Sequence, residues 1–334
     1  GLSYRAGELD ANQWVNLAGS RGARTARSDQ DATGLDLFVE GRIFVRDDFA
    51  LVAGGSYGRA ERDYQSYPPS AIVVTDSETY DWFAPRIGFL WQNEQGAQVY
   101  GNFTQSVEPP NFGALAPTTG GFQPLRAQEA WTAELGTRGR VGAFVWDVAI
   151  YRADIDNELL TFSVNPALGI PAATFNARDG TIHQGVEAGL DWDITDSLRL
   201  RQTYMWSDFR FDGDRQYGDN RLPIVPEHLY KAELKWTTAN GFWIAPSVEW
   251  SLRDVFVDYM NTFRAPSYSV ANLSAGKDFD NGVRLFLDIR NPTDERYVSN
   301  FNALVNWNTS TAAQRAIFWP GDERSFFGGV AFNF

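Results

Sequence analysis

The side chains that most often carry out chemistry in proteins are scarce in this sequence. Cysteine is absent, and the two histidines, His183 and His228, stand far apart in the chain. A thiolate zinc site and a cysteine nucleophile are therefore excluded, and an imidazole-based metal centre is disfavoured. We interpret both histidines as solvent-exposed residues at strand ends. We predict no catalytic residue, no metal ligand and no enzyme activity.

One long segment gathers acidic side chains that could bind a divalent cation. Its aspartates are Asp208, Asp212, Asp214 and Asp219. Their spacing does not match the D-x-[DN]-x-[DN]-G loop of an EF-hand. The arginines interleaved with them are Arg210, Arg215 and Arg221. We therefore interpret the segment as a solvated loop whose charges pair with one another rather than as a metal site.

The overall charge and composition exclude further classes of protein. The 334 residues carry 42 acidic and 29 basic side chains, a net charge of −13, without a clustered basic stripe, which argues against nucleic-acid binding. The longest uncharged stretch, Leu159 to Ala177, contains prolines and asparagines, so it is no spanning helix. Mean hydropathy is −0.34, yet 15% of the residues are aromatic. A membrane β-barrel reconciles these values, because only alternate strand residues face lipid.

Apolar and polar residues alternate in several parts of the chain, which is the period of a β-strand. In one such segment Val283, Leu285, Leu287 and Ile289 share a face, and Arg284, Asp288 and Arg290 share the other. Residues 35–45, 186–194 and 230–236 follow the same pattern. So many charged faces do not fit one soluble core. The pattern predicts strands with one face in lipid and the other in a wet lumen.

Connections of two lengths alternate along the chain. Short turns are predicted at 46–48, 93–96, 138–142, 195–197, 239–241 and 280–282. Between them lie long segments near 61–79, 106–126, 161–177, 208–227, 257–267 and 302–323. The prolines in the long segments cannot continue a β-ladder. Short periplasmic turns that alternate with long outside loops indicate an outer-membrane barrel.

The pattern predicts about fourteen strands in an all-β, transmembrane antiparallel β-barrel. We expect residues 1–32 to be an outside loop with at most a partial strand, and residues 33–334 to be the C-terminal part of the barrel. The last strand carries Phe332 and Phe334 on one face. A terminal aromatic on such a strand resembles the assembly signal that the bacterial barrel assembly machinery binds.

Five motifs, in order along the chain, resemble those of TonB-dependent outer-membrane receptors of the siderophore and ferric-citrate type. They are Glu108–Phe112, Leu125–Gly136, Phe175–Glu187, Arg221–His228 and Asn291–Tyr297. Each motif is weak alone, but five in the right order make a specific match, which extends over residues 15–334. Pro292 stands where the family usually has leucine, which is tolerated at a strand end but not within a ladder.

The resemblance implies a 22-stranded barrel with a plugged lumen. No plug domain and no TonB box are recognised in this sequence, so we expect a portion of a longer receptor. The implied function is energised uptake of a scarce ligand, a ferric siderophore or ferric citrate-like chelate, through the bacterial cell outer membrane. The implied partners are the TonB complex, the barrel assembly machinery, outer-membrane lipid and the metal chelate. No resident cofactor is implied, since the ferric chelate is the transported ligand.

The outside loops carry side chains suited to such a chelate, because aromatic rings stack on it while guanidinium and amide groups bind its oxygens. We predict ligand contacts from Phe122, Arg126, Tyr259, Arg264, Asn302, Asn306, Trp307 and Arg315. Further candidates are Tyr64, Tyr67, Phe112 and Phe263. Aromatic residues also form the interface belts of barrels, which leaves Asn306 and Arg315 as the stronger candidates.

Two other functions fit the same strand pattern. One is a complete 14-stranded passive outer-membrane channel for small polar solutes, and the other is an adhesin or structural barrel. A complete channel requires residues 1–10 to pair with residues 325–334. For the receptor that the resemblance implies, the ligand classes left open are iron chelates, cobalamin, haem, nickel complexes and oligosaccharides.

Overall fold

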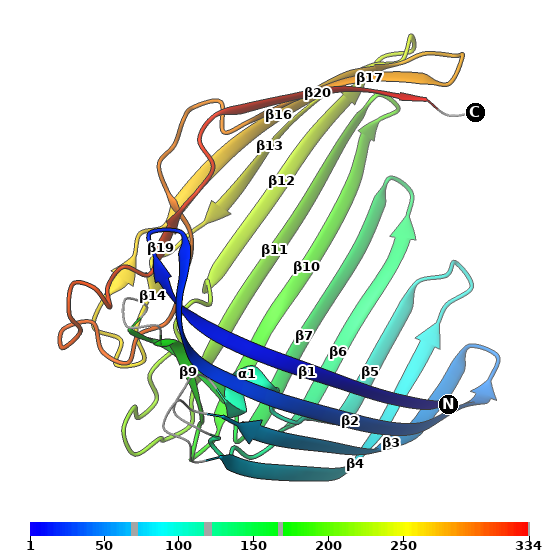
Figure 1. The fold of residues 1–334 in the computed structure, drawn as a ribbon. Helices are drawn as coiled ribbons and strands as arrows, with labels where there is room; N and C mark the ends of the chain where they lie inside the picture. Colours follow the sequence, from blue (N-terminus) through cyan, green and yellow to red (C-terminus); the bar gives the residue numbers. More distant parts are fainter. Residues whose placement is uncertain (68–72, 117–121, 166–169, 333–334) are drawn as a thin grey trace.

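One large antiparallel sheet forms most of the molecule (Figure 1). The computed structural model describes residues 1–67, 73–116, 122–165 and 170–332. The 14 strands of the sheet are β1 (Leu2–Leu17), β2 (Ser20–Arg46), β3 (Phe49–Ser66), β4 (Val74–Gln92), β5 (Gln98–Glu108), β6 (Gln128–Val141), β7 (Phe144–Asp156), β10 (Thr181–Thr195), β11 (Leu198–Phe211), β12 (His228–Thr237), β13 (Phe242–Ser251), β16 (Tyr268–Asp278), β17 (Val283–Arg290) and β20 (Ser325–Phe332). They pair in this order, so the prediction of an all-β fold with about fourteen strands is confirmed.

Smaller elements lie in the connections between these strands. In the described residues they are α1 (Phe112–Leu115), β8 (Leu159–Asn165), β9 (Ile170–Asn176), β14 (Val255–Phe256), β15 (Arg264–Ala265), β18 (Val298–Phe301) and β19 (Phe318–Pro320). The strands pair as β8 with β9, β14 with β15 and β18 with β19. Over the same residues, no helix has the length and apolar character to cross a membrane.

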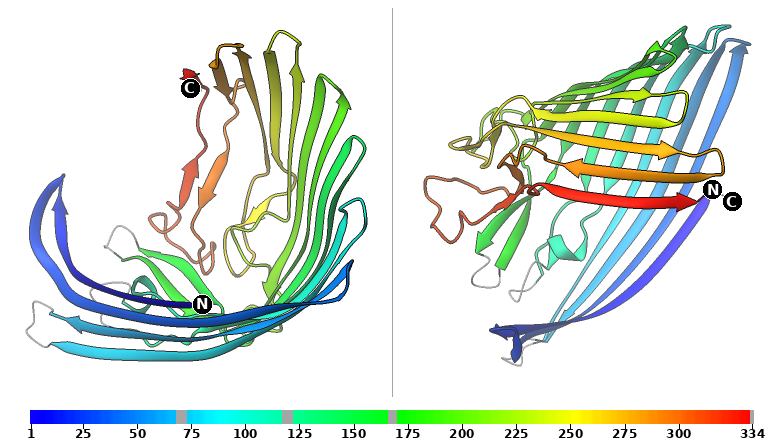
Figure 2. Two further views of the ribbon diagram at one scale, coloured as in Figure 1. Left: turned by 90° about the vertical axis from the view of Figure 1, so that its right-hand side faces the viewer. Right: turned by 90° about the horizontal axis from the view of Figure 1, so that it is seen from above.

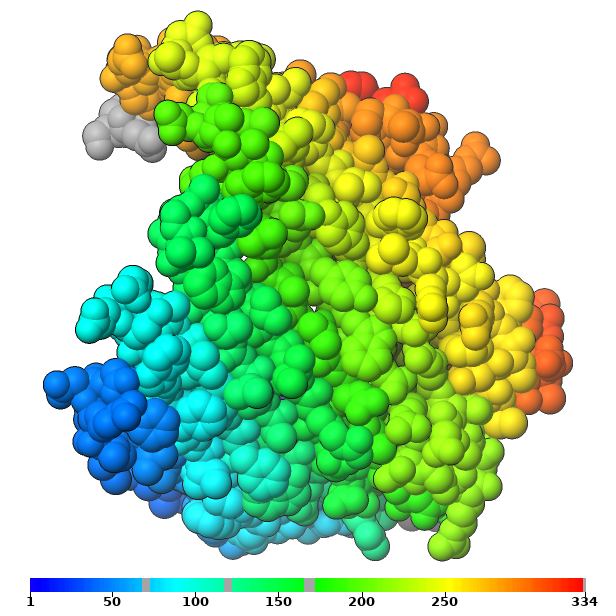
Figure 3. Space-filling view, turned by 180° about the vertical axis from the view of Figure 1, so that it is seen from behind, coloured from blue at the N-terminus to red at the C-terminus, as the bar shows by residue number. Residues whose placement is uncertain are grey.

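The alternation of side chains gives the sheet two different faces. Across one row, Leu135 pairs with Ile150, Ile150 with Val186, and Val186 with Trp206, so apolar side chains line up on one face. Ile150 remains 51% exposed, as expected for a face that lipid rather than protein covers. Figure 3 shows the sheet from behind as a continuous surface, along which the strands follow one another in chain order.

Short turns join the strands at one end of the sheet, close to the predicted positions. The turn predicted at 138–142 is shorter than expected, because β6 extends to Val141 and only two residues separate it from β7. Several predicted long loops are partly strand: β3 and β4 reach Ser66 and Val74, and residues 161–177 lie largely in the β8–β9 hairpin. The alternation of short and long connections is therefore found from β2 onward.

The first 32 residues differ from the prediction. Residues 1–32 are not a loop, because β1 and β2 pair from Leu2 opposite Leu37 to Leu17 opposite Ser20, with register shifts only between Gln13 and Asn16. The connection is a two-residue turn, Ala18 and Gly19, with φ of 50° and 88°. Positive φ at both positions matches the twist of a tight hairpin. Gly19 is thus a hairpin residue rather than a sign of a loop.

The two ends of the strand order lie at β1 and β20, which do not pair with each other in the described residues. Figure 2 shows the sheet as a curved trough rather than a closed ring. The ladder between β16 and β17 ends at Arg290, so Pro292 lies beyond it and removes no ladder hydrogen bond. Its presence in place of leucine therefore leaves the sheet intact.

Candidate functional site

The longer connections pack together at one end of the sheet, and we call this assembly the loop layer. It consists of residues 109–116, 122–127, 157–165, 170–180, 212–227, 252–267 and 291–324. Figure 2 shows several of these segments gathered within the curve of the trough. The loop layer is a packed structure, since two larger apolar cores and a smaller one form inside it.

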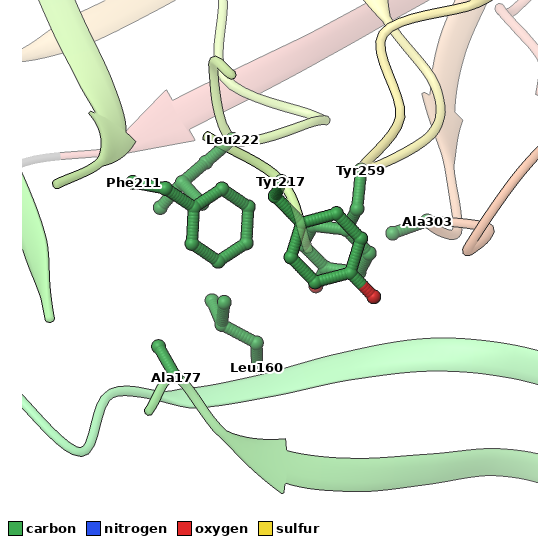
Figure 4. Packing of buried hydrophobic residues seen from close by; sticks show 7 residues of the cluster. All are labelled: Leu160, Ala177, Phe211, Tyr217, Leu222, Tyr259 and Ala303. Atoms are coloured by element: carbon green, nitrogen blue, oxygen red, sulfur yellow. The ribbon is translucent and has the colours of Figure 1, made fainter. Parts of the chain in front are cut away.

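The first core joins several of these connections around tyrosine rings, and we call it the tyrosine core (Figure 4). Its buried residues are Leu160, Ala177, Phe211, Tyr217, Leu222, Tyr259 and Ala303. The ring of Phe211 stacks on Tyr217 at 4.7 Å between centroids, and Phe175 meets Tyr259 edge-on at 5.5 Å. Such aromatic pairs contribute about 0.5–1.5 kcal/mol beyond their burial. The core therefore fixes segments that lie far apart in the sequence.

The second core lies between the β14–β15 and β18–β19 sheets, and we call it the valine core. Its buried residues are Val255, Val257, Ala265, Phe301, Leu304 and Ile317. Half-buried Val298, Trp307 and Phe318 pack against it. Leu304 and Val257 also join through their backbones, since the Leu304 N–H donates to the Val257 carbonyl at 2.9 Å. The valine core thus holds the 252–267 connection against the final one.

Tyr259 is a core residue rather than a ligand contact. Its side chain is only 3% exposed, and its hydroxyl donates to the Thr161 carbonyl oxygen at 2.9 Å. Burial, together with the nearby Glu158 carboxylate, raises the pKa of Tyr259 far above its usual value. The phenol therefore stays protonated and serves as a donor. The prediction that Tyr259 contacts ligand from the surface is wrong for this arrangement, because the tyrosine core encloses its ring.

Phe263, Trp307 and Arg315 come together at the surface of the loop layer, and we call them the Trp307 group. The rings of Phe263 and Trp307 stack with centroids 4.1 Å apart and planes 8° from parallel. The Arg315 guanidinium carbon lies 4.9 Å from the Trp307 ring centroid, and its Nε donates to the Trp307 carbonyl at 3.0 Å. Phe263 is 39% exposed. The group therefore presents the Phe263 ring to solvent, while Trp307 and Arg315 are half-buried.

Arg315 forms no salt bridge in the described residues, and its Nε and one terminal N–H group donate to the carbonyl oxygens of Trp307 and Asn308 at 3.0 and 3.4 Å. Asn306, which precedes Trp307, uses its Oδ1 to accept the Asn308 N–H at 2.9 Å. Asn306 therefore shapes the turn that carries Trp307. Guanidinium groups bind carboxylates and other anionic oxygens in a planar, bidentate manner. The Trp307 group is accordingly suited to a bulky ligand with anionic oxygens.

Arg264 and Asn302 stand in the same two connections as Phe263 and Trp307, respectively. The Arg264 guanidinium stacks over the Phe256 ring at 4.0 Å and lines a narrow pocket with Glu227 and Asp254. The Asn302 side chain is exposed, while its backbone N–H donates to the Ile317 carbonyl at 3.2 Å. Both side chains are accessible, as a ligand contact requires.

Phe122 and Arg126 occupy a different part of the loop layer. Phe122 packs against a small core that includes Leu115, and its ring lies 5.7 Å from that of Tyr64. Arg126 is exposed, and its backbone exchanges two hydrogen bonds with the Asn176 side chain, at 2.9 and 3.0 Å. The structure does not join these residues to the Trp307 group by any direct contact.

The histidines and aspartates take up structural positions. The His183 side chain is 19% exposed, lies flat on Phe209 at 3.9 Å and contacts the Glu158 carboxylate at 3.2 Å. The His228 side chain is 21% exposed, so the interpretation of both histidines as solvent-exposed is wrong, although His228 does stand at a strand end as the first residue of β12. Asp208 pairs with Arg221 at 3.1 Å, as the self-paired loop predicts. In the described residues, no three acidic or histidine side chains converge to hold a metal ion.

Gly54–Gly58 has the G-x-S-x-G spacing of a hydrolase nucleophile motif. Its serine, Ser56, lies in the middle of β3, opposite Phe38 in β2 and Ala84 in β4. A hydrolase nucleophile instead stands on a sharp turn between a strand and a helix. The run therefore has the spacing of the motif without its structural context.

Two features of the last strand bear on the predicted assembly signal. Phe332 is the final residue of β20 and is 59% exposed. Phe334 lies outside the described residues, so its role stays a prediction.

Comparisons with known proteins agree with the architecture. Residues 1–291 match the family described as TonB dependent receptor-like, beta-barrel. The chain belongs to the TonB-dependent receptor family, whose members are transport receptors of the bacterial outer membrane. The expected family, fold and location are therefore confirmed.

Individual relatives are distant in sequence. The ferrioxamine B receptor of Salmonella typhimurium is 24% identical over 258 residues, which cover 75% of this chain and 34% of that protein. A probable TonB-dependent siderophore receptor, PiuA, of Acinetobacter baumannii is 23% identical over 304 residues, covering 81% of this chain and 38% of that protein. The chain thus spans about a third of the length of these curated relatives.

Solved structures share the fold. The ferric yersiniabactin uptake receptor FyuA of Yersinia pestis superposes with a TM-score of 0.77 at 17% identity, covering 98% of this chain and 49% of that one. The ferric-catecholate import receptor Fiu of E. coli K12 gives a TM-score of 0.75 at 18% identity, covering 100% of this chain and 51% of that one. At such identities the likeness establishes the fold alone.

Proposed function

We propose that this chain is part of a receptor for TonB-dependent, energised uptake of a ferric siderophore or ferric citrate-like chelate. The observation that carries the proposal is the family match over residues 1–291, joined to a partly exposed aromatic and cationic surface at the loop end of the sheet. The relatives named above include a ferrioxamine B receptor and a siderophore receptor. The chain catalyses no covalent step in this proposal.

The Trp307 group supplies the chemistry of recognition in this account. Ferric hydroxamate, catecholate and citrate complexes present oxygen atoms around a bulky metal centre. The stacked rings of Phe263 and Trp307 would pack against the organic part, and the Arg315 guanidinium would bind the oxygens. Arg264 and Asn302, exposed on neighbouring segments, would add polar contacts.

We further propose that the 14 strands belong to a larger plugged barrel, and that TonB acts on regions outside this sequence. The share of the relatives that the chain covers supports this, since the solved receptors extend over about twice its length. Outer-membrane lipid would cover the apolar outer face. The barrel assembly machinery would act on the last strand.

A complete 14-stranded passive channel is less well supported. Such a channel needs β1 to pair with β20, and these strands are the two ends of the strand order in the described residues. An adhesin or structural barrel has no specific observation in its favour.

Growth under iron limitation tests the proposed function. The protein is expressed from its own gene in a strain that lacks siderophore receptors, and ferrioxamine B or ferric citrate is the sole iron source. We expect growth with at least one of these chelates, and no growth when TonB is deleted. Growth that persists without TonB would support the passive channel instead.

A further inference from the structure

Asp258 is a fully buried carboxylate at the point where two loops of the loop layer cross. It stands in the connection between β14 and β15, and its side chain is 0% exposed. A carboxylate is costly to bury unless hydrogen bonds replace its hydration. In the described chain no lysine, arginine or histidine pairs with it, so hydrogen bonds alone balance its charge. The partners of these hydrogen bonds therefore indicate what Asp258 does.

The two carboxylate oxygens of Asp258 have different partners. Oδ1 accepts the backbone N–H groups of Thr262 at 2.9 Å and Phe263 at 3.1 Å, both in its own loop. Oδ2 accepts the Thr262 hydroxyl at 2.6 Å and the backbone N–H of Trp307 at 3.1 Å, in the final connection. One oxygen therefore shapes the local turn, and the other joins it to a segment 49 residues further along the chain.

The residues that Asp258 holds are the two stacked rings of the Trp307 group. One carboxylate binds the backbone N–H of both Phe263 and Trp307, whose rings lie 4.1 Å apart. The backbones nearby are also joined, because the Tyr259 N–H donates to the Leu304 carbonyl at 3.0 Å and the Met260 N–H to the Val305 carbonyl at 3.2 Å. These bonds join the two loops, but neither of them involves the backbone of Phe263 or Trp307.

We propose that Asp258 is a positioning residue of the ligand-facing surface, which keeps Phe263 and Trp307 in register as one rigid recognition element. It contacts no ligand itself, since it is fully buried. The predicted effect of Asp258 on ligand affinity rests on the proposed function. The coupling between the two loops does not depend on what the ligand is, so the two can be tested separately.

The asymmetry of the carboxylate allows a sharp test. Asp258→Asn can keep an oxygen at the Oδ1 position, where it still accepts the Thr262 and Phe263 N–H groups. Its NH2 group then occupies the Oδ2 position and cannot accept a hydrogen bond from the Trp307 N–H. Thr262→Val is the matched control, because it removes the hydroxyl bond to Oδ2 and leaves the Trp307 bond intact. Hydrogen exchange of the Trp307 amide, measured on the full protein in detergent, is the first measurement.

We expect Asp258→Asn to accelerate exchange of the Trp307 amide at least about tenfold, and Thr262→Val to change it far less. Unchanged exchange in Asp258→Asn would overturn the proposal, as would equal acceleration in both variants. In the unsubstituted protein, both the Phe263 and the Trp307 amides should be protected from exchange, because each donates to the buried Asp258 carboxylate. Trp307 exchange as fast as that of an exposed loop amide contradicts the proposal even if Asp258→Asn fails to assemble.

Affinity for ferrioxamine B and for ferric citrate is the second measurement. We expect Asp258→Asn to weaken binding about tenfold and Thr262→Val to preserve it, with Asp258→Glu failing to rescue, since the longer side chain displaces both oxygens. Wild-type affinity that survives in Asp258→Asn despite faster Trp307 exchange overturns the positioning role. If neither chelate binds the unsubstituted protein, the proposed ligand class fails while the exchange data still decide the coupling.

Discussion

The ring of Phe263 lies flat on the indole of Trp307, with planes 8° from parallel, although the two residues belong to different connections of the sheet. The Arg315 guanidinium lies over the same indole at 4.9 Å. The Arg315 contact lies within one connection, eight residues from Trp307, whereas the Phe263 contact joins two connections and depends on the packing of the loop layer. The candidate recognition surface is therefore a product of tertiary structure.

Trp307→Ala should weaken binding of the ferric chelate about tenfold, a loss of about 1.4 kcal/mol. It removes both the stacked ring and the surface that holds the Arg315 guanidinium. Titration of the purified protein with ferrioxamine B or ferric citrate measures the change. Trp319→Ala is the control, because Trp319 is exposed in the same connection and lies outside the Trp307 group. Equal losses in both variants would show that Trp307 has no special role.

Arg315→Ala combined with Asn306→Ala should lower both affinity and uptake, since the pair loses a cation that forms no salt bridge in the described residues and the side chain that shapes the Trp307 turn. Arg215→Ala provides the comparison, because its side chain is 91% exposed in another connection of the loop layer. We expect the comparison variant to bind and take up ligand normally. Unchanged uptake in the double variant would remove Arg315 and Asn306 from the site.

The pH dependence of the loop layer follows from Tyr259. Burial raises its pKa in the folded protein, so the neutral phenol stabilises the layer fully below the ordinary value of 10.0 and less as pH rises above it. The loss amounts to about 1.4 kcal/mol per pH unit for one such tyrosine. An absorbance titration should show that Tyr259→Phe removes one tyrosine from the group that ionises last. If Tyr259→Phe instead removes a tyrosine that ionises early in the titration, Tyr259 is not buried as the structure describes.

Phe334→Ser should lower the amount of assembled barrel without altering ligand affinity in the molecules that do assemble. The reason is the predicted assembly signal on the last strand. Outer-membrane yield and affinity are measured together. Phe326→Ser, at an exposed position at the start of β20, is the control. If both variants assemble equally well or equally poorly, the terminal position carries no signal of its own.

Much of the sheet could be predicted because its strands repeat a period of two and end in short turns. Residues 284–290 show why: each pairs with one residue of β16, and successive side chains lie on opposite faces of the sheet. The β1–β2 hairpin could not be predicted, because residues 18–32 are as polar as a loop although most of them pair in strands. A two-residue turn at Ala18 and Gly19 is a weaker signal than the surrounding arginines and glycines.

The candidate site could be predicted only in part. Residue type and position in a long connection suggest Trp307 and Arg315 as ligand contacts, but they suggest Tyr259 equally. Tyr259 is buried because of how the loops pack, which the sequence does not show. Asp258 gave no signal at all, because an aspartate in a polar loop is usually solvated. Asn176 and Asn291 belong to recognised motifs, yet their contacts are structural: Asn291 is 2% exposed and its amide donates to the carbonyls of Glu295 and Asp322.

Uptake of radioactive iron most directly tests the central claim of energised transport. Cells that express the protein receive iron-labelled ferrioxamine B or ferric citrate, with TonB present or deleted, and surface binding is measured alongside accumulation. We predict that deletion of TonB abolishes accumulation while surface binding persists. Accumulation that continues at the same rate without TonB would contradict the account and identify a passive pore.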